Sequence, residues 1–277
     1  MATSFGNETL GSSYAENAGF WVRIIRERLD RYRLGLTDSA VLNAIGPSGS
    51  MTILDAGCGE GYLSRILAQQ GAHVIAVDAC AELVESARAI ARESGLSIDY
   101  RTCSVDDLPI ADGHCDIVVC NHLVNDLRDI SAPVAEFSRV TREGGRLVML
   151  MLHPCFYGAG AEQEAMNGFL TPDEYFRVRV VEQKFNVAGI RSPAPVRIWL
   201  RPLEDYTAAL RDAGFFITSL SEPHPSTEQL TGDPWWRENF VRPLFLLIVA
   251  EKGRTQWSRH DTATAATSGA MWQGRNG

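Results

Sequence analysis

Between residues 51 and 152 the chain alternates short apolar runs with amphipathic segments, and this alternation constrains the fold more than any other feature. The apolar runs include MTILDAG, HVIAVDA, CDIVVCNH and RLVMLML. The segments between them include EGYLSRILAQQG, AELVESARAIARESG and SAPVAEFSRVTREGG, in which apolar residues recur at helical spacing. Buried strands that alternate with amphipathic helices are typical of a parallel sheet covered on both faces. We therefore predict an α/β fold with a doubly wound, mostly parallel, Rossmann-like sheet over residues 51–152.

The sequence on either side of this core predicts additions to the sheet. Residues 1–50 carry a helical stripe of apolar side chains, so we expect an N-terminal helical lid. Residues 153–200 are punctuated by proline and glycine and contain two extended stretches, which indicates an inserted β-hairpin that caps the substrate side. Residues 201–253 add a helix and two late strands joined by a loop, so we expect an antiparallel last strand. Residues 254–277 have the composition of a disordered tail.

Charge and composition exclude several classes of partner. The net charge of the 277 residues is −8, and no cluster of basic and aromatic residues appears, which argues against a nucleic-acid partner. The longest apolar runs are strand-sized and the polar N-terminus lacks a signal-peptide core, so we expect no membrane segment and a cytoplasmic location. The six cysteines form no CxxC pair and His122 with Asp126 lacks a third ligand, so we expect no metal site.

A turn with three glycines follows the first apolar run. Gly57, Gly59 and Gly61 stand between a predicted strand and a predicted helix, where a ligand approaches the backbone too closely for a Cβ atom. Asp78 ends the second predicted strand, and a carboxylate there accepts hydrogen bonds from both ribose hydroxyls of an adenosine. The two features together predict a nucleoside ligand.

The residues around the glycines favour a cationic ligand. The turn reads G-x-G-x-G rather than the dinucleotide pattern G-x-G-x-x-G, with Asp55 before it and Glu60 within it. Negative charge suits a pyrophosphate poorly. It suits S-adenosylmethionine, which has a sulfonium, an ammonium and an adenosine but no phosphate.

Four segments, in register, resemble class I S-adenosylmethionine-dependent methyltransferases of the small-molecule branch, which includes enzymes of ubiquinone and menaquinone biosynthesis and natural-product tailoring. They are LDAGCGEGYLSRILA, VIAVDAC, DDLPIADGHCDIVVCNHLVND and EFSRVTREGGRLVML, and RPLEDYTAALRDAGF extends the resemblance more weakly. The resemblance implies a seven-stranded sheet and S-adenosylmethionine as cofactor, with S-adenosylhomocysteine as product. It also implies a small-molecule acceptor from secondary or quinone-like metabolism.

The resemblance also assigns cofactor-binding residues. In such enzymes the first motif binds the methionine moiety, and the acid that ends the second strand binds the ribose. The residues after the third strand contact adenine, and the segment after the fourth strand runs along the ligand. A helix near the N-terminus covers it. The residues are Asp55, Gly57, Gly59, Gly61, Asp78, Ser104, Val105, Asp106, Asn121, His122, Tyr14 and Trp21. Ser104 replaces an acid found in many relatives, which puts the adenine contact in doubt. Each residue also has a structural interpretation, since a glycine can serve helix packing alone and Asp78 can cap the next helix.

Ligands of open α/β sheets lie beyond the carboxyl ends of the strands, which directs attention to residues after the fourth and fifth strands. Asn125 and Asp126 follow the fourth strand, and we expect them to border the acceptor. His153 follows the fifth strand and is our candidate for a general base or an orienting group. The alternative is a histidine hydrogen-bonded within its own turn, because Pro154 demands a rigid bend there.

Aromatic side chains are concentrated in the inserted and late segments. We expect them to line an acceptor pocket, and the competing interpretation is an interface between copies of the chain. These residues are Tyr157, Tyr175, Phe176, Trp199, Trp235 and Trp236.

The function predicted from these features is methyl transfer from S-adenosylmethionine to a small apolar or aromatic metabolite. Catalysis would come chiefly from proximity and orientation, and oxygen, nitrogen and carbon acceptors all remain open. One alternative is a protein that binds the cofactor as a scaffold without methylating, either as a binding module or as a cyclase. A nicotinamide-dependent oxidoreductase is disfavoured by the spacing of the glycines, and methylation of RNA or protein is disfavoured by the negative charge.

Overall fold

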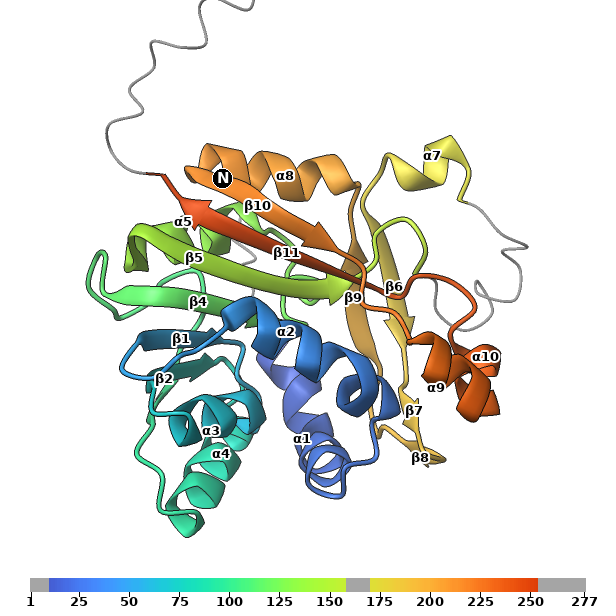
Figure 1. The fold of residues 1–277 in the computed structure, drawn as a ribbon, viewed down its shortest axis with the longest axis horizontal. Helices are drawn as coiled ribbons and strands as arrows, with labels where there is room; N and C mark the ends of the chain where they lie inside the picture. The colour runs from blue at the N-terminus through green and yellow to red at the C-terminus, as the bar shows by residue number, and fades with distance from the viewer. Residues whose placement is uncertain (1–9, 158–169, 254–277) are drawn as a thin grey trace, which may run out of the picture.

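The computed structural model describes residues 10–157 and 170–253, and its core is a seven-stranded sheet in the order β10-β11-β5-β4-β1-β2-β3 (Figure 1). The strands are β1 (Thr52–Ala56), β2 (His73–Asp78), β3 (Asp99–Thr102), β4 (Cys115–Asn121), β5 (Thr141–Leu152), β10 (Phe215–Ser221) and β11 (Phe245–Lys252). β11 runs antiparallel to both of its neighbours, whereas the pairs from β5 to β3 are parallel. The predicted doubly wound sheet with an antiparallel last strand is confirmed.

Helices cover both faces of the sheet, as the alternating pattern predicts. One face is covered by α5 (Ser131–Val140) and α8 (Leu203–Asp212), and the other by α2 (Asp38–Ile45), α3 (Tyr62–Gln69) and α4 (Ala81–Glu93). Phe137 of α5 and Tyr206 of α8 are fully buried on the first face, and Leu67 of α3 and Ile45 of α2 on the second. Burial of each such side chain contributes about 1.5–3 kcal/mol.

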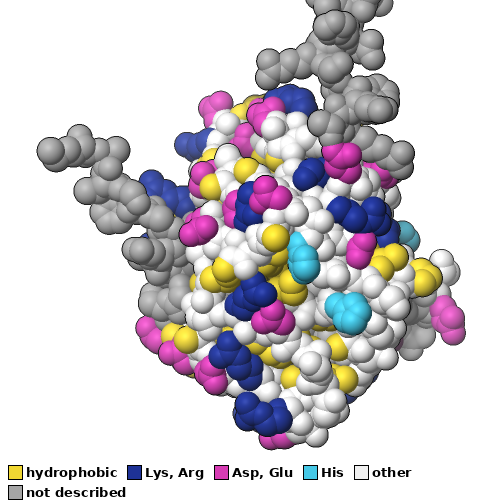
Figure 2. Space-filling view, turned by 90° about the vertical axis from the view of Figure 1, so that its left-hand side faces the viewer, with side chains coloured by type: hydrophobic (Ala, Val, Ile, Leu, Met, Phe, Trp, Pro, Cys, Tyr) yellow, Lys and Arg dark blue, Asp and Glu magenta, His cyan; other side chains and the backbone are white. Residues whose placement is uncertain are grey.

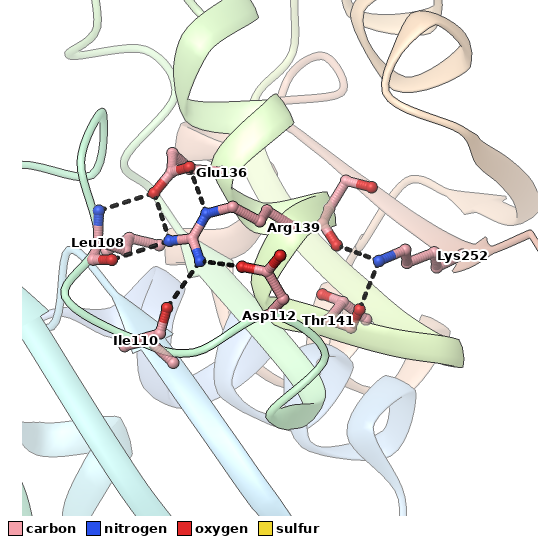
Figure 3. A network of polar contacts seen from close by, with 8 residues as sticks. Leu108, Ile110, Asp112, Glu136, Arg139, Thr141 and Lys252 are labelled. Atoms are coloured by element: carbon pink, nitrogen blue, oxygen red, sulfur yellow. Dashed lines mark hydrogen bonds and ion pairs between the residues drawn. The ribbon is translucent and has the colours of Figure 1, made fainter.

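α5 is shorter than the sequence predicts, and its end is fixed by charged side chains. The helix stops at Val140 instead of running on toward Gly145, and Gly144 has a φ of 68° that a helix does not allow. Near its end, Arg139 binds Glu136, Asp112 and the carbonyl oxygens of the preceding loop (Figure 3). These bonds hold the loop between β3 and β4 against the helix.

The N-terminal segment forms α1 (Leu10–Arg26), the π-helical turn η2 (Arg33–Thr37) and α2. Ala18 of α1 packs on Cys80 and Leu83 beside α4. Asn17 is fully buried, and its side-chain amide donates to the carbonyl of Ala194 (3.1 Å) and accepts from the amide of the same residue (3.0 Å). α1 is therefore bonded to the inserted segment far away in the sequence.

The insertion is the predicted hairpin. A short helix, α7 (Pro172–Tyr175), precedes it. β6 (Arg179–Gln183) pairs with β9 (Val196–Leu200), and at the tip of the hairpin β7 (Asn186–Val187) pairs with β8 (Ile190–Arg191). In Figure 1 the arrowheads of β4 and β5 point toward this hairpin. The backbone amide of Trp199 on β9 donates to the carbonyl of Asn125 (2.6 Å), which fixes the hairpin beyond the carboxyl ends of the strands.

The segment between β10 and β11 is helical, where the sequence analysis expects a loop. It forms α9 (Thr227–Gly232) and α10 (Pro234–Asn239). Ser226 and Gln229 make a reciprocal capping box on α9, and the Asp233 side chain caps α10, which begins at Pro234. The segment that joins the two late strands thus contains two successive helix starts.

The surface carries mixed charge. On the face shown in Figure 2, basic and acidic side chains are interspersed, without a field of one sign. Within residues 10–157 and 170–253, none of the helices combines the length and apolar character that a membrane crossing requires. The division of the chain into five segments stays a prediction, and the predicted tail 254–277 lies outside the described residues.

Candidate functional site

A cavity of about 600 Å³ lies at the carboxyl ends of β1, β2 and β4, and α1, the hairpin tip and α10 contribute to its walls. Most of the residues singled out in the sequence line it. They are Tyr14, Trp21, Asp55, Gly57, Gly59, Asp78, Ser104, Val105, Asn121, His122, Asn125, Asp126, Tyr157 and Trp235. The fold thus gathers residues from α1 to α10 around one space.

The three glycines of the turn after β1 serve different purposes. All have positive φ, and Gly57 and Gly59 line the cavity. A Cβ atom on Gly59 would meet no protein atom within 4 Å, whereas one on Gly61 would overlap the hydroxyl of Tyr100. Gly61 is absent from the cavity lining, so the prediction that it contacts a cofactor is corrected: it allows close packing at the start of α3.

The two acids of the turn are tied to the protein. Asp55 is buried and accepts a hydrogen bond from the hydroxyl of Ser64 (2.6 Å), and burial raises its pKa to about 6. Glu60 is buried in an ion pair with Arg65 (2.8 Å), which compensates its charge. The negative charge expected of this turn therefore comes from Asp55 more than from Glu60.

Asp78 connects the first two βα turns. One carboxylate oxygen accepts from the amide of Gly59 (2.8 Å) and the other from the amide of Cys80 (2.8 Å), the residue that precedes α4. Burial raises the pKa of Asp78. The side chain thus fixes the residue before α4 and also lines the cavity, and its role in binding stays a prediction.

The segment after β3 contributes two of the three residues expected near adenine. Ser104 and Val105 line the cavity, whereas Asp106 does not. The Asp106 carboxylate accepts a hydrogen bond from the hydroxyl of Ser104 (3.2 Å). The expectation that Asp106 contacts the ligand is not supported by its position.

Beyond β4, Asp126 and His122 line the cavity, and desolvation shifts their pKa values in opposite directions. Asp126 accepts a hydrogen bond from the hydroxyl of Tyr14 on α1 (2.7 Å), and desolvation raises the pKa of Asp126 to about 7. Desolvation lowers the pKa of His122 to about 4, and the ring stacks edge-on against Phe245. His122 has a φ of 62°, a strained backbone conformation of the kind that clusters at functional sites.

Several buried polar atoms of the cavity wall lack a protein partner among the described residues. They are Trp21 Nε1, Asn121 Oδ1, and Nε and Nη2 of Arg33. The guanidinium of Arg33 lies over the ring of Tyr62, 4.2 Å from its centroid. Since buried donors without a partner are costly, these atoms suit polar groups of a ligand, and the two nitrogens of Arg33 suit an anionic one.

Arg33 is a residue that the sequence analysis missed. It ends the stretch RIIRERLDRYR, whose arginines alternate with apolar residues as on a solvated helix face. α1 ends at Arg26, and the turn η2 redirects the chain so that Arg33 points inward. The early end of the helix is not encoded in that alternation.

His153 lies outside the cavity lining, and the expectation that it acts as a base is corrected. Its Nε2 lies 2.8 Å from a carboxylate oxygen of Glu222, and its Nδ1 accepts from the amide of Cys155 (3.2 Å). The ring is buried against Phe156. This is the alternative interpretation, a histidine held within its own turn.

Of the expected aromatic lining, Tyr157 and Trp235 face the cavity, whereas the other four residues do not. Tyr175 accepts a hydrogen bond from the amide of Leu203 (3.0 Å), and Phe176 is 65% exposed. Trp236 is buried against Tyr32 and Gly35, and Trp199 pairs within the hairpin. Other residues complete the apolar wall: Tyr32, Leu152, Phe185, Ile198, Leu244 and Phe245. A role for Phe176 in an interface stays a prediction.

Asn125 lines the cavity and also joins three elements. Its side-chain oxygen accepts from the amide of Leu152 (2.8 Å), and its amide group reaches the carbonyl of Trp199 (3.5 Å) and the hydroxyl of Tyr206 (3.4 Å). These contacts hold the loop after β4 against β5, β9 and α8. Its hydrogen-bonding capacity is thus directed at the protein.

The core of the chain is similar in sequence to known methyltransferases. Residues 54–149 match the family described as "Methyltransferase domain". The ubiquinone biosynthesis O-methyltransferase of Xylella fastidiosa strain 9a5c is 39% identical over 103 residues, which are 36% of this chain and 42% of that protein. The chain thus spans less than half the length of the curated relatives it matches.

Solved structures share the fold over a longer range. The S-adenosylmethionine-dependent methyltransferase of Mesorhizobium loti has a TM-score of 0.59 and 23% identity, over 77% of this chain and 96% of that one. The cyclase SpnF has a TM-score of 0.63 and 17% identity, over 90% and 97%. At these identities the likeness concerns the fold alone.

Proposed function

We propose that this protein transfers a methyl group from S-adenosylmethionine to a small apolar or aromatic acceptor, because residues 54–149 match a methyltransferase domain. The observation that carries the proposal is the cavity itself. It brings an open glycine backbone, the acid that ends β2 and unpartnered buried polar atoms to one place. S-adenosylmethionine supplies an activated methyl group on its sulfonium.

The residues of the cavity wall fit the polar groups of this ligand. Asp78 binds the ribose hydroxyls, and Gly59 leaves room for the ligand against the backbone. Nε and Nη2 of Arg33 form a two-donor fork for the methionine carboxylate, and Asn121 Oδ1 accepts from the ammonium group. Ser104 and Val105 border adenine. The unpartnered atoms of Arg33 and Asn121 thereby gain partners, which supports the assignment.

The apolar part of the cavity holds the acceptor. Tyr32, Phe185, Trp235 and Phe245 contribute aromatic rings from four different segments. α1 and the segment between β8 and β9 are bonded to each other through Asn17 and Ala194, which holds the wall formed by Trp21 and Phe185 together. Orientation of an acceptor at near-attack distance contributes about 7–11 kcal/mol to methyl transfer without any covalent role for the protein.

Calorimetric titration tests the binding part of the proposal. We expect S-adenosylmethionine and S-adenosylhomocysteine to bind and NAD to show no heat of binding. Asp78→Asn should weaken S-adenosylhomocysteine by about tenfold or more, because charge-assisted hydrogen bonds are lost. Glu85→Gln is the matched control, since Glu85 is an exposed acid on α4 that pairs only with Arg88 within the helix. Absence of binding to the wild-type protein would overturn the proposed function.

Transfer is tested separately with S-adenosylmethionine labelled on its methyl group. The labelled methyl should appear in members of a panel of phenols, anilines and acidic carbon compounds. Tight cofactor binding without transfer to any of these would favour the alternative, in which the cofactor serves as a scaffold.

A further inference from the structure

The loop after β4 places one carboxylate of the cavity in an unusual position. Asp126 lines the cavity, and within residues 10–157 and 170–253 its carboxylate accepts one hydrogen bond, from the hydroxyl of Tyr14. Of the other acids that line the cavity, Asp78 accepts from two backbone amides and Glu60 pairs with Arg65. Asp55 accepts from the hydroxyl of Ser64, and Asp30 from the backbone amide of Arg33. Asp126 thus keeps an oxygen for another donor.

We propose that Asp126 is the general base of this site, that Tyr14 positions it, and that the acceptor is a hydroxyl compound such as a phenol. This inference rests on the proposed function and deepens it. A neutral amine attacks without losing a proton first, whereas a hydroxyl acceptor gains from a base placed beside it. A cavity that holds a weakly partnered carboxylate is therefore suited to a hydroxyl acceptor.

The surroundings of Asp126 favour proton uptake. Tyr14 on α1 donates a hydrogen bond to it, and Asp78 at the end of β2 is a second acid nearby. The phenol of Tyr157 after β5 and the thiol of Cys120 on β4 also interact with its charge. Desolvation and the charge of Asp78 raise the pKa of Asp126, and the hydrogen bond from Tyr14 lowers it. At about 7, this pKa lies where a base is both ionised and strong enough to take a proton.

The other candidate bases fit less well. His122 lines the cavity, but desolvation lowers its pKa to about 4, which makes it a weak base. His153 lies outside the lining and is occupied by Glu222 and Cys155. The comparison leaves Asp126 as the base with the best-matched pKa among these side chains.

The proton and the electrons of the proposed step balance. Asp126 takes the proton of the acceptor hydroxyl while the hydroxyl oxygen bonds to the methyl carbon. The bond between that carbon and sulfur breaks, and its electron pair remains on sulfur in the product. Asp126 then releases its proton to water, and Tyr14 keeps the carboxylate in place throughout.

Two variants separate the base from its positioning residue. Asp126→Asn should bind S-adenosylhomocysteine with an affinity within about threefold of the wild type. Its rate of methyl transfer to phenols should be lower by ~100-fold or more and should no longer rise near pH 7. Tyr14→Phe should retain transfer while its rise of rate moves to higher pH, because the hydrogen bond that lowers the pKa is removed. Asp107→Asn is the matched control, an exposed acid outside the cavity lining.

A second readout needs no substrate. Asp126 stays protonated in the folded protein up to about pH 7 but ionises near pH 4 when unfolded, so the folded wild type loses stability as the pH rises between these values. The asparagine variant lacks this loss. Without ligand, the melting temperature of Asp126→Asn minus that of the wild type should therefore increase by ~5–10 °C from pH 5 to pH 8.

The outcomes are distinct. Three results would each overturn the inference: full transfer to phenols by Asp126→Asn, transfer by the wild type to anilines but to no phenol, or cofactor binding with no phenol methylated. The proposed function keeps its own test. A melting-temperature difference that stays constant with pH would also overturn it. Failure of the wild type to bind S-adenosylhomocysteine would overturn the proposed function, and the pH dependence would still report on Asp126.

Discussion

At the scale of single residues, the turn after β1 contains two kinds of glycine. Gly59 is open toward the cavity, whereas Gly61 packs against Tyr100 and Ala87. Both have positive φ, so any side chain costs about 1–2 kcal/mol of backbone strain at either position. The additional cost of a methyl group differs because its surroundings differ.

Alanine at each position should separate these roles. Gly61→Ala is expected to lower the free energy of unfolding by about 3 kcal/mol or more, since its methyl group overlaps the Tyr100 hydroxyl. Gly59→Ala should cost about 1–2 kcal/mol but weaken S-adenosylhomocysteine tenfold or more, because the methyl group enters the cavity. Urea unfolding and calorimetry measure the two quantities. Equal effects of the two variants on binding would contradict the distinction.

Arg33 is the second residue whose role depends on position alone. Its substitution by glutamine should weaken S-adenosylhomocysteine about 10- to 100-fold, the value of charge-assisted hydrogen bonds of 1.5–3 kcal/mol. The ligand-free protein should be no less stable, because two buried guanidinium nitrogens that lack a partner among the described residues are removed. Arg26→Gln is the control, as Arg26 is exposed and 4.0 Å from Glu93. Equal affinity of the two variants would exclude the carboxylate fork.

At the scale of elements, closure of the site depends on contacts between segments distant in sequence. α1 meets the hairpin through Asn17 and Ala194 and through the rings of Trp21 and Phe185, 5.0 Å apart. α10 meets the segment before η2 where the Tyr32 hydroxyl donates to the carbonyl of Asn239 (2.7 Å). The lid, the cap and α10 thus form one rim around the cavity.

Asn17→Ala tests this rim. The substitution removes the partner of the buried amide of Ala194, at a cost of about 1–3 kcal/mol, while the carbonyl of Ala194 keeps the hydrogen bond from the Ser192 hydroxyl (3.1 Å). Hydrogen–deuterium exchange over residues 185–194 should become faster, while β1, β4 and β5 keep their protection. Glu16→Ala, on the exposed face of α1, should leave the exchange unchanged. Faster exchange throughout the sheet would show instead that α1 supports the core as a whole.

At the scale of the whole molecule, the cavity makes the folded state sensitive to pH. Burial raises the pKa of Asp55 to about 6 and of Asp126 to about 7, so the folded protein holds protons that the unfolded chain has already released. His122 opposes this below pH 6.5, because its lowered pKa favours the folded state as the pH rises from 4 to 6.5. Above pH 6.5 only the effect of the carboxyl groups remains.

The ligand-free protein should therefore lose about 1 kcal/mol of unfolding free energy between pH 6.5 and pH 8. Urea denaturation at fixed ionic strength measures the change, and a constant slope of the transitions ensures that the comparison is valid. Stability that rises over this interval would mean that neither carboxyl group is protonated in the folded state at pH 6.5.

The sequence by itself determined the core of this protein. The alternation of apolar runs with amphipathic segments predicts the buried strands β1, β2, β4 and β5, and the three glycines predict the turn after β1. Both signals can be read from the sequence because they depend on neighbours along the chain. Residues that follow β1, β2 and β4 reach the cavity because the carboxyl ends of parallel strands lie at one edge of the sheet.

Only the tertiary structure decided the remainder of the site. Whether Arg33 points inward, whether Asp126 meets Tyr14, and whether His153 faces the cavity or Glu222 depend on the directions of α1, the hairpin and β10. Those directions follow from packing between segments more than a hundred residues apart, such as Asn17 against Ala194. Local patterns carry no record of such contacts, because burial and hydrogen bonding at these positions arise only when the distant segments come together.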